Sequence, residues 1–430
     1  MMERALDSHT SGTEDARPTE LTLIVETALG LFARKVPAAL PLPAGVDPGI
    51  GAEMAAHQAA ATWGLPDFVL RPVVRRVGSR QRELGDCLLL SGKRGAVVQI
   101  KSRQGRYKDD AGERSWLHSR SRKAARQAKG TVRNLHSSPA EFANGRDRPV
   151  SIHGQNHEWI GVIVLDHERI PPETVVDCSD SGLLSVALIR RDWDFLFHQL
   201  RSTTAVLDYL FRVADLPAIA LGEEPRRYYE LASADAAAPP GTMDGSLIGG
   251  AAEPISVPLL PQAPTGWENV GAHLAMRIVM EDLATMPFTT MSEAERLMIL
   301  ADVDRLPVAV RAEWGQLLLD MLDDVGLVPD DEVKWRFRRF INDMGTRHLI
   351  FGCASRFDPD IGYGFQTYTE LRHHELSERS GKGPETSTVG VLLTPRSDGR
   401  QSWDTSTVRM EGNLSLTSEQ LEFYRELWPR

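Results

Sequence analysis

Apolar residues recur in the first half of the chain with two different periods, and each period predicts a different kind of element. Where they return every three to four positions, helices are predicted, and these cover 20–34, 51–63, 115–135 and 192–213. Short runs rich in apolar and β-branched residues predict strands, and these cover 68–77, 86–90, 96–102, 159–166 and 186–190. Because helices and strands alternate along the chain, we expect an α/β domain whose mixed sheet is flanked by helices.

Composition changes near residue 231, where charged residues become rare. Residues 231–262 are rich in Ala, Gly and Pro, which is typical of an interdomain linker. The polar stretch 1–20 has no apolar run and is expected to be a disordered tail. Residues 21–230 would then form the first domain, since 430 residues are more than one core usually organises.

The chain after the linker shows helical patterns first and mixed patterns later. Helical spacing dominates 263–345, where Ser292 and Glu295 have the spacing of a capping box before an apolar run. Residues 346–430 contain both kinds of pattern and predict a small α/β unit. Its expected elements are strands at 348–354 and 388–394 and helices at 365–378 and 418–427.

Overall composition is typical of a globular protein from a reducing compartment. The chain is 42% hydrophobic and 25% charged, and no apolar run approaches the roughly 18 to 20 residues that would span a bilayer. The N-terminus also lacks the apolar segment of a secretory signal. Cys87, Cys178 and Cys353 form no CxxC pair, so neither a disulfide framework nor a zinc ribbon is indicated. We therefore expect a cytoplasmic protein with buried thiols and no membrane partner.

Positive charge is concentrated in one segment of an otherwise acidic chain. The whole chain has a net charge of −10. Residues 65–150 contain 20 Lys and Arg against 8 Asp and Glu, a net charge of +12, which leaves −22 for the remainder (−10 − 12). A local excess of this kind is typical of a surface that binds a polyanion, because neutralised phosphates release their counterions. A merely solvated basic surface would show the same charge pattern.

Polar side chains interrupt two otherwise apolar strands that are predicted to pair as a hairpin. If residues 92–95 form the turn, antiparallel pairing puts Asp86 opposite Lys101. The same register puts Leu88 opposite Gln99. Because side chains alternate with period two, Asp86, Gln99 and Lys101 would share one face of the sheet. Burying a carboxylate, an amide and an ammonium group together is costly unless they pair or bind an ion, so the hairpin predicts either an ion site or a simple cross-strand ion pair.

These residues resemble the motif of the PD-(D/E)XK nuclease superfamily, and most of all that of Mrr-type restriction endonucleases and archaeal-type Holliday-junction resolvases. The resemblance covers roughly 50–166. Its elements are Glu53 on the first helix, Asp86 at the start of the second strand, and Gln99 with Lys101 on the third strand. Gln99 departs from the pattern, because most members carry Glu or Asp there, although some Mrr-like branches carry Gln. The resemblance implies a restriction-endonuclease-like fold and an endonuclease that hydrolyses phosphodiester bonds of DNA.

The resemblance also implies a metal site in which Glu53, Asp86, Gln99 and Lys101 are the catalytic residues. Asp86, the Gln99 side-chain oxygen and the Ile100 carbonyl would hold Mg²⁺, with Mn²⁺ as a substitute, because hard cations prefer oxygen ligands. Glu53 would complete or orient this shell. The ion would polarise the phosphodiester and lower the pKa of a bound water, while Lys101 positions that water or stabilises charge on phosphorus.

The basic helix predicted after the third strand supplies side chains that could grip the backbone of nucleic acid, in the first place double-stranded DNA. The expected contact residues are Arg103, Arg120, Arg122, Lys123, Arg126, Gln127, Lys129 and Arg133. Gln127 could also point towards the site. The acidic C-terminal region would recognise a partner protein, regulate the nuclease or form a homodimer, and an effector of a bacterial defence or restriction system would suit that layout.

Two other functions remain open on the sequence alone, together with several weaker candidate residues. The chain could be a nucleic-acid-binding protein whose nuclease fold has lost catalysis, or an interaction scaffold without nucleic acid. Glu83 is the natural substitute for Glu53 as an acidic ligand. His373 and His374 are neighbours on a predicted helix, where surface or capping roles are expected. The histidines around the strand at 159–166 match no metal-site spacing; they are His153, His157 and His167.

Overall fold

The computed structural model describes residues 20–27, 30–72, 76–77, 80–81, 86–105, 107–237, 260–267, 269–287, 291–329, 332–341, 346–381, 383–396 and 402–429. Glu83 therefore lies outside the described residues, as do most of the predicted tail and residues 238–259 of the predicted linker. Among the described residues, no helix is both long enough and apolar enough to cross a membrane.

The described chain begins with a two-stranded ribbon, so the helix predicted at 20–34 is wrong. Strands β1 (Leu21–Thr27) and β2 (Gly30–Val36) pair in antiparallel fashion. The apolar residues here also satisfy a period of two, because Leu21, Leu23 and Val25 lie on one face of β1. Gly30 has a φ of 120°, a backbone conformation that glycine adopts readily, and it starts the second strand directly after the connection.

A seven-stranded mixed sheet forms the centre of the first unit, as the alternating pattern predicts. Its strand order is β11-β10-β7-β6-β3-β8-β9. Strands β3, β6 and β7 form an antiparallel meander, and β10 and β11 run parallel to β7. Their bounds are β3 Val69–Pro72, β6 Cys87–Ser91, β7 Arg94–Ser102, β8 Ala140–Asn144, β9 Pro149–Ile152, β10 Glu158–Asp166 and β11 Ser185–Ile189. Strands β4 (Arg76–Val77) and β5 (Arg80–Gln81) pair with each other in a separate, short two-stranded sheet.

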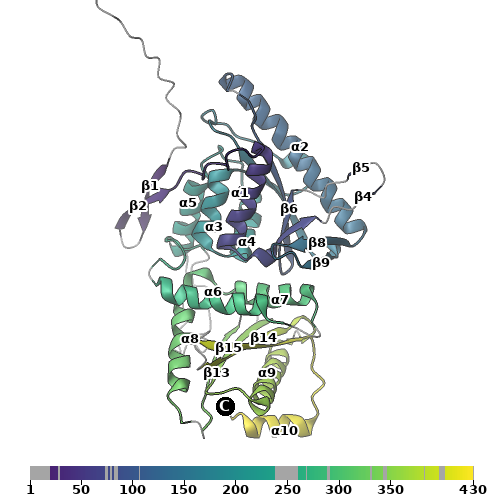
Figure 1. Ribbon diagram of the computed structural model, residues 1–430, viewed down its shortest axis with the longest axis vertical. Helices are drawn as coiled ribbons and strands as arrows, with labels where there is room; N and C mark the ends of the chain where they lie inside the picture. The colour runs from purple at the N-terminus through teal and green to yellow at the C-terminus, as the bar shows by residue number, and fades with distance from the viewer. Residues whose placement is uncertain are drawn as a thin grey trace, which may run out of the picture.

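Helices cover both faces of the sheet, as Figure 1 shows. Helix α2 (Asp110–Ser137) packs on one face through its buried alanines and leucines. Helices α1 (Pro48–Trp63), α3 (Arg190–Leu200) and α4 (Thr203–Ala214) pack on the other. The two faces are set by the period-two alternation of β6 and β7, whose buried side chains divide between the two helical layers.

The long helix predicted at 192–213 is interrupted, and it forms α3 and α4. Arg201 has a φ of 48° and ends α3, and the Ser202 hydroxyl accepts a hydrogen bond from the Ala205 amide at 3.0 Å to begin α4. The apolar residues that produce this amphipathic pattern are buried; they are Trp193, Leu196, Leu200, Leu207 and Leu210. Helix α5 (Glu224–Ala237) follows, so the start of the predicted linker is helical.

The second unit begins with three helices and continues with a four-stranded sheet. Helices α6 (Val270–Thr285), α7 (Glu293–Asp304) and α8 (Arg311–Gly326) occupy the predicted helical region, and the capping box of Ser292 and Glu295 is confirmed. Strand β12 (Trp335–Ile341) replaces the helical pattern expected up to residue 345. The remaining elements are β13 Arg347–Ala354, α9 Pro359–Ser380, β14 Ser387–Pro395, β15 Trp403–Glu411 and α10 Ser418–Leu427, with strand order β12-β13-β14-β15.

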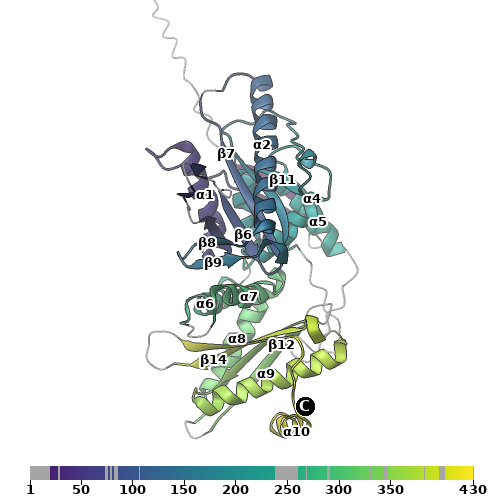
Figure 2. The same ribbon diagram turned by 90° about the vertical axis from the view of Figure 1, so that its right-hand side faces the viewer.

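The two units share one apolar core. Helices α6 and α7 lie between the two sheets in both views (Figures 1 and 2). A single cluster of buried residues runs from Phe68 and Leu88 in the first unit, through Met276 and Leu300, to Phe351 of the second sheet. The helices of the second unit therefore have two roles. They pack in the core of their own unit, and they cover one end of the first sheet.

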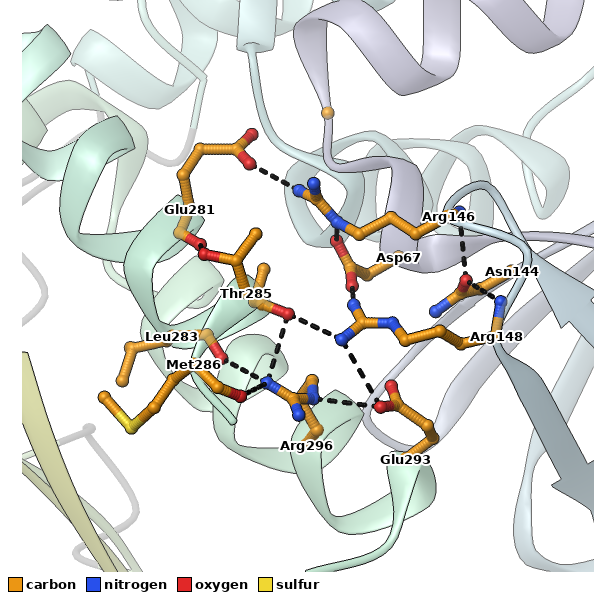
Figure 3. Close-up of polar contacts among 12 residues, drawn as sticks. Asp67, Asn144, Arg146, Arg148, Glu281, Leu283, Thr285, Met286, Glu293 and Arg296 are labelled. Atoms are coloured by element: carbon orange, nitrogen blue, oxygen red, sulfur yellow. Dashed lines mark hydrogen bonds and ion pairs between the residues drawn. The ribbon is translucent and has the colours of Figure 1, made fainter. Parts of the chain in front are cut away.

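A network of arginines and carboxylates reinforces this junction (Figure 3). Asp67 is completely buried and pairs with both Arg146 and Arg148, which leave the turn between β8 and β9. Arg146 continues to Glu281 on α6, and Arg148 donates to the Ala284 carbonyl at 2.8 Å. Through its two guanidinium partners, the buried Asp67 carboxylate of the first unit is thus linked to helix α6 of the second unit.

Candidate active site

The hairpin that carries the motif has a tighter turn than the sequence suggested. Ser91 pairs with Arg94 and Cys87 with Val98, so the turn consists of Gly92 and Lys93. The predicted register, with Asp86 opposite Lys101, is therefore wrong by two residues. Gly92 has a φ of 57°, which suits the first position of a two-residue hairpin turn. A shift by two leaves every side chain on its predicted face, because the pleat repeats every two residues.

Asp86, Gln99 and Lys101 meet at one end of this hairpin. The Lys101 ammonium lies 3.5 Å from Asp86 Oδ2 and donates to Gln99 Oε1 at 3.3 Å. The Ile100 backbone amide also donates to Asp86 Oδ2, at 2.5 Å. Cys87 and Ile100 point to the opposite face, into the core beneath α1. The convergence expected from strand alternation is confirmed.

The site lies where strands of the sheet end. Lys101 is near the carboxyl end of β7, and the parallel strand β10 ends beside it, with Lys101 paired to Leu165 and Ser102 to Asp166. The side chains of Lys101 and Asp86 remain 21% and 15% exposed, so solvent reaches both groups. Ligands of open α/β sheets commonly bind beyond the carboxyl ends of parallel strands.

Helix α1 brings Glu53 and His57 towards the start of β6. Glu53 is half-buried, and its charge acts on the Cys87 thiol. The pKa of Cys87 is raised chiefly by burial, then by the carboxylates of Asp86 and Glu53, which places both acids near this strand. Glu53 on α1 and Asp86 before β6 therefore both lie near Cys87, whose thiol is on the α1 side of the sheet.

His57 is a neighbour of the site that sequence reasoning missed. It follows Glu53 by four residues, a spacing that puts two side chains on one face of a helix. Burial lowers the pKa of His57, and the positive charge of Arg71 acts in the same direction, while the Asp86 carboxylate raises it. Within the described part of the chain, His57 Nε2 is buried without a hydrogen-bond partner. The helical spacing from Glu53 was the signal that could have found it.

The candidate ligands for a hard cation at this site are of two kinds, carboxylate oxygens and a neutral amide oxygen. No group of three or more His, Cys, Asp or Glu side chains in the described residues is arranged to hold a metal ion. Asp86 supplies a carboxylate here and Gln99 a neutral oxygen, and both are ligand types that suit Mg²⁺. Ile100 contacts Asp86 through its amide.

A second buried carboxylate organises the loop that follows Lys101. Glu113 on the first turn of α2 is completely buried. Arg103 donates to both Glu113 oxygens, at 2.8 and 3.1 Å, and the Lys108 amide donates at 3.1 Å. His167, which follows β10, lies 3.0 Å from the same carboxylate. Arg103, expected to contact nucleic acid, thus has its guanidinium engaged within the fold, where it links the ends of β7 and β10 to α2.

Acid titration should reveal how much Glu113 stabilises the fold. Hydrogen bonds from Arg103 are the main reason that the pKa of Glu113 is lowered from 4.5 to about 2. A depressed folded-state pKa stabilises the fold above the unfolded pKa, and this stabilisation is lost as the pH falls from about 4.5 towards 2. We expect Glu113→Gln to lower the free energy of unfolding at neutral pH by about 1–3 kcal/mol in urea titrations. The difference from the wild type should shrink in acid, and a constant difference would contradict this role.

The outer side of α2 presents the basic residues named in the sequence. Its inner side is buried through Leu117, Ala124, Ala128 and Leu135. The outward residues are all exposed; they are Arg120, Arg122, Lys123, Arg126, Gln127, Lys129 and Arg133. Gln127 is exposed among the basic residues. A helix with this many exposed cations and a largely apolar inner side forms a positive surface beside the sheet.

The histidines outside the motif have separate structural partners. His157 Nδ1 lies 3.1 Å from the Gly92 carbonyl, and His167 binds Glu113. His373 is completely buried, 2.8 Å from Thr388 Oγ1 and 2.7 Å from the Gly412 carbonyl, so the surface or capping role expected for it is wrong. The three thiols of Cys87, Cys178 and Cys353 are free and buried, as predicted.

Comparisons of this chain with protein-family models, with curated proteins and with solved structures gave no match.

Proposed function

We propose that the protein is a Mg²⁺-dependent endonuclease that hydrolyses phosphodiester bonds of DNA, with a site of the PD-(D/E)XK type. The observation that carries the proposal is the Lys101 ammonium, which lies between the Asp86 carboxylate and the Gln99 amide at the exposed end of β7. Glu53 on α1 is the proposed fourth catalytic residue.

The order of elements supports the restriction-endonuclease-like fold that the motif implies. Glu53 lies on the helix that precedes a three-stranded meander of β3, β6 and β7. Asp86 directly precedes the second strand of this meander, and Gln99 and Lys101 lie on its third strand. The motif residues therefore follow one another along these elements in the order that the resemblance implies.

The chain's own side chains can perform the positioning steps of phosphodiester hydrolysis. Lys101 donates two of its three N–H groups to Asp86 and Gln99, and the third can hold an attacking water or meet the negative charge that develops on a phosphoryl oxygen. Asp86 keeps the ammonium in place and is itself oriented by the Ile100 amide. Asp86, Gln99 and Glu53 would hold Mg²⁺ or Mn²⁺, which when bound supplies a Lewis acid and a water of lowered pKa.

The exposed cations of α2 support duplex DNA as the substrate. A row of Lys and Arg along one helix can neutralise successive phosphates without reading the bases. The proposed contact residues are those named on the outer side of α2, with Gln127 among them. The acidic second unit would then act as a recognition or regulatory part, and an effector of bacterial defence or restriction in the cytoplasm is the setting that we propose.

Gln99 favours one second candidate, a nuclease-fold protein that binds DNA without cutting it. The neutral amide removes one negative charge from the proposed metal site, and hard cations are held largely by carboxylates. Weak metal binding would leave the α2 surface and its phosphate contacts intact. The two candidates therefore predict the same binding of DNA, and only the endonuclease is expected to cut it.

Cleavage of plasmid DNA by the purified full chain, with Mg²⁺ or Mn²⁺ and with EDTA, tests the proposal. We expect the wild type to cut only with metal, and Asp86→Ala to bind duplex DNA normally without cutting. Asp323→Ala, which changes an exposed aspartate on α8, is the control that should cut normally. Salt-dependent binding with no cleavage under any metal would favour the binding protein, and no salt-dependent binding would exclude both.

A further inference from the structure

The ribbon of β1 and β2 stands apart from the rest of the first unit (Figure 1). A two-stranded ribbon alone is marginally stable in water. Its inner face packs on the first unit through Val25 and Val36. Hydrogen bonds also join it to later segments: Arg34 Nε donates to the Gln262 carbonyl at 3.2 Å, and the Ser233 hydroxyl donates to the Glu26 carbonyl at 3.2 Å. A cleft of about 680 Å³ separates part of β1 from α5. The ribbon therefore has room for further stabilising contacts.

The outer face of the ribbon carries apolar residues in the open. Ile24 and Leu31 are 68% and 70% exposed, and Ala33 is exposed between them. Ile24 pairs with Ala33 across the ribbon, and Leu31 lies in the next row. Large aliphatic side chains of an edge ribbon are normally covered or replaced by charges, since they otherwise promote association.

Opposite charges flank this apolar centre on the same face. Glu26 pairs with Leu31 in the row nearest the turn, and Lys35 pairs with Thr22 in the row at the other end. Lys35 also pairs with Glu20 at 3.0 Å, but both side chains are largely exposed, so this ion pair is easily exchanged. From the turn outwards, the rows of this face are Glu26 with Leu31, Ile24 with Ala33, and Thr22 with Lys35. The row nearest the turn is therefore negative, the middle row is apolar and the last row is positive.

We infer that this face is an interface between two copies of the chain. A two-fold axis along the middle row stacks Ile24 and Ala33 of one copy on those of the other. It also lays the row of Glu26 and Leu31 of each copy over the row that holds Lys35 in the other. The same patch serves both partners, as a two-fold interface requires. A face with one acid and one base is poorly suited to a polyanion, so charge complementarity favours a second copy. This interface is independent of the proposed nuclease activity.

Light scattering and sedimentation of the purified full chain test this interface. The wild type should have twice the protomer mass of 47.6 kDa at micromolar concentration. Ile24→Thr/Leu31→Thr keeps residues that suit a strand and should weaken the dimer by about tenfold or more. Leu327→Thr, at a position 85% exposed on the second unit, is the control that should remain dimeric.

A charge exchange distinguishes this geometry from a general loss of solubility or folding. Glu26→Lys alone and Lys35→Glu alone should each weaken the dimer, because each brings like charges together. The double variant Glu26→Lys/Lys35→Glu should restore it. A monomeric wild type would overturn the inference, and so would a dimer that is unaffected by the ribbon variants or not rescued by the double exchange.

Discussion

Lys101→Met is expected to reduce metal-dependent DNA cleavage by roughly 10²-fold or more while leaving duplex binding almost unchanged. The methionine occupies a similar volume but has no N–H to donate to a water or phosphoryl oxygen. Asp86 would lose the ammonium at 3.5 Å but keep the Ile100 amide at 2.5 Å, so the carboxylate should stay in place. Single-turnover cleavage and a binding titration on the same DNA separate the two effects.

The matched control for this substitution lies at the other end of the same hairpin. Lys93 is exposed in the turn between β6 and β7, so Lys93→Met also removes one positive charge from this hairpin. Its cleavage rate should remain within about twofold of the wild type. Equal losses in the two variants would indicate a general electrostatic effect, and an unaffected Lys101→Met would remove Lys101 from the catalytic residues.

Asp67→Asn should destabilise the whole protein by about 3 kcal/mol or more. Asp67 is fully buried between Arg146 and Arg148, so the amide would leave two partly buried guanidinium groups short of one negative charge. Figure 3 shows that these arginines continue to Glu281 and to the end of α6, so the effect should reach both units. Urea unfolding of the full chain measures it.

Asp147→Asn provides the comparison, because it changes an aspartate in the turn between β8 and β9 that carries Arg146 and Arg148. Asp147 pairs with Arg71, but its side chain is 84% exposed, and exposed pairs contribute about 0–1 kcal/mol. Asparagine also tolerates the φ of 60° at this position. Similar losses at both positions would show that the buried network contributes no more than a surface ion pair.

The site itself was largely predictable, although the register was not. Strand alternation needs only the parity of residue numbers, so Asp86, Gln99 and Lys101 could be placed on one face even with the wrong turn. The turn depended on whether Gly92 or Gly95 adopts a positive φ, and both are glycines. His57 was missed because a histidine at helical spacing from an acid has many structural roles.

Helical and strand patterns were ambiguous where both periods fitted. The segment from Leu21 to Val36 satisfies a period of two as well as a helical period, and its contact with α5 favours the ribbon. The break at Arg201 is equally local, since one residue with a φ of 48° divides a continuous amphipathic pattern. Propensity is a weak guide at such places, because tertiary contacts outweigh it.

By itself, the sequence determined the alternation of helices and strands, the basic character of α2, the capping box at Ser292 and the shared face of the motif residues. Each of these depends on periodicity or on neighbours in the chain. Only the tertiary structure decided that Asp67 joins Arg146 and Arg148, that Glu113 holds Arg103, and that one core connects both units. Such contacts join residues far apart in the sequence, and their energies depend on burial that no local pattern records.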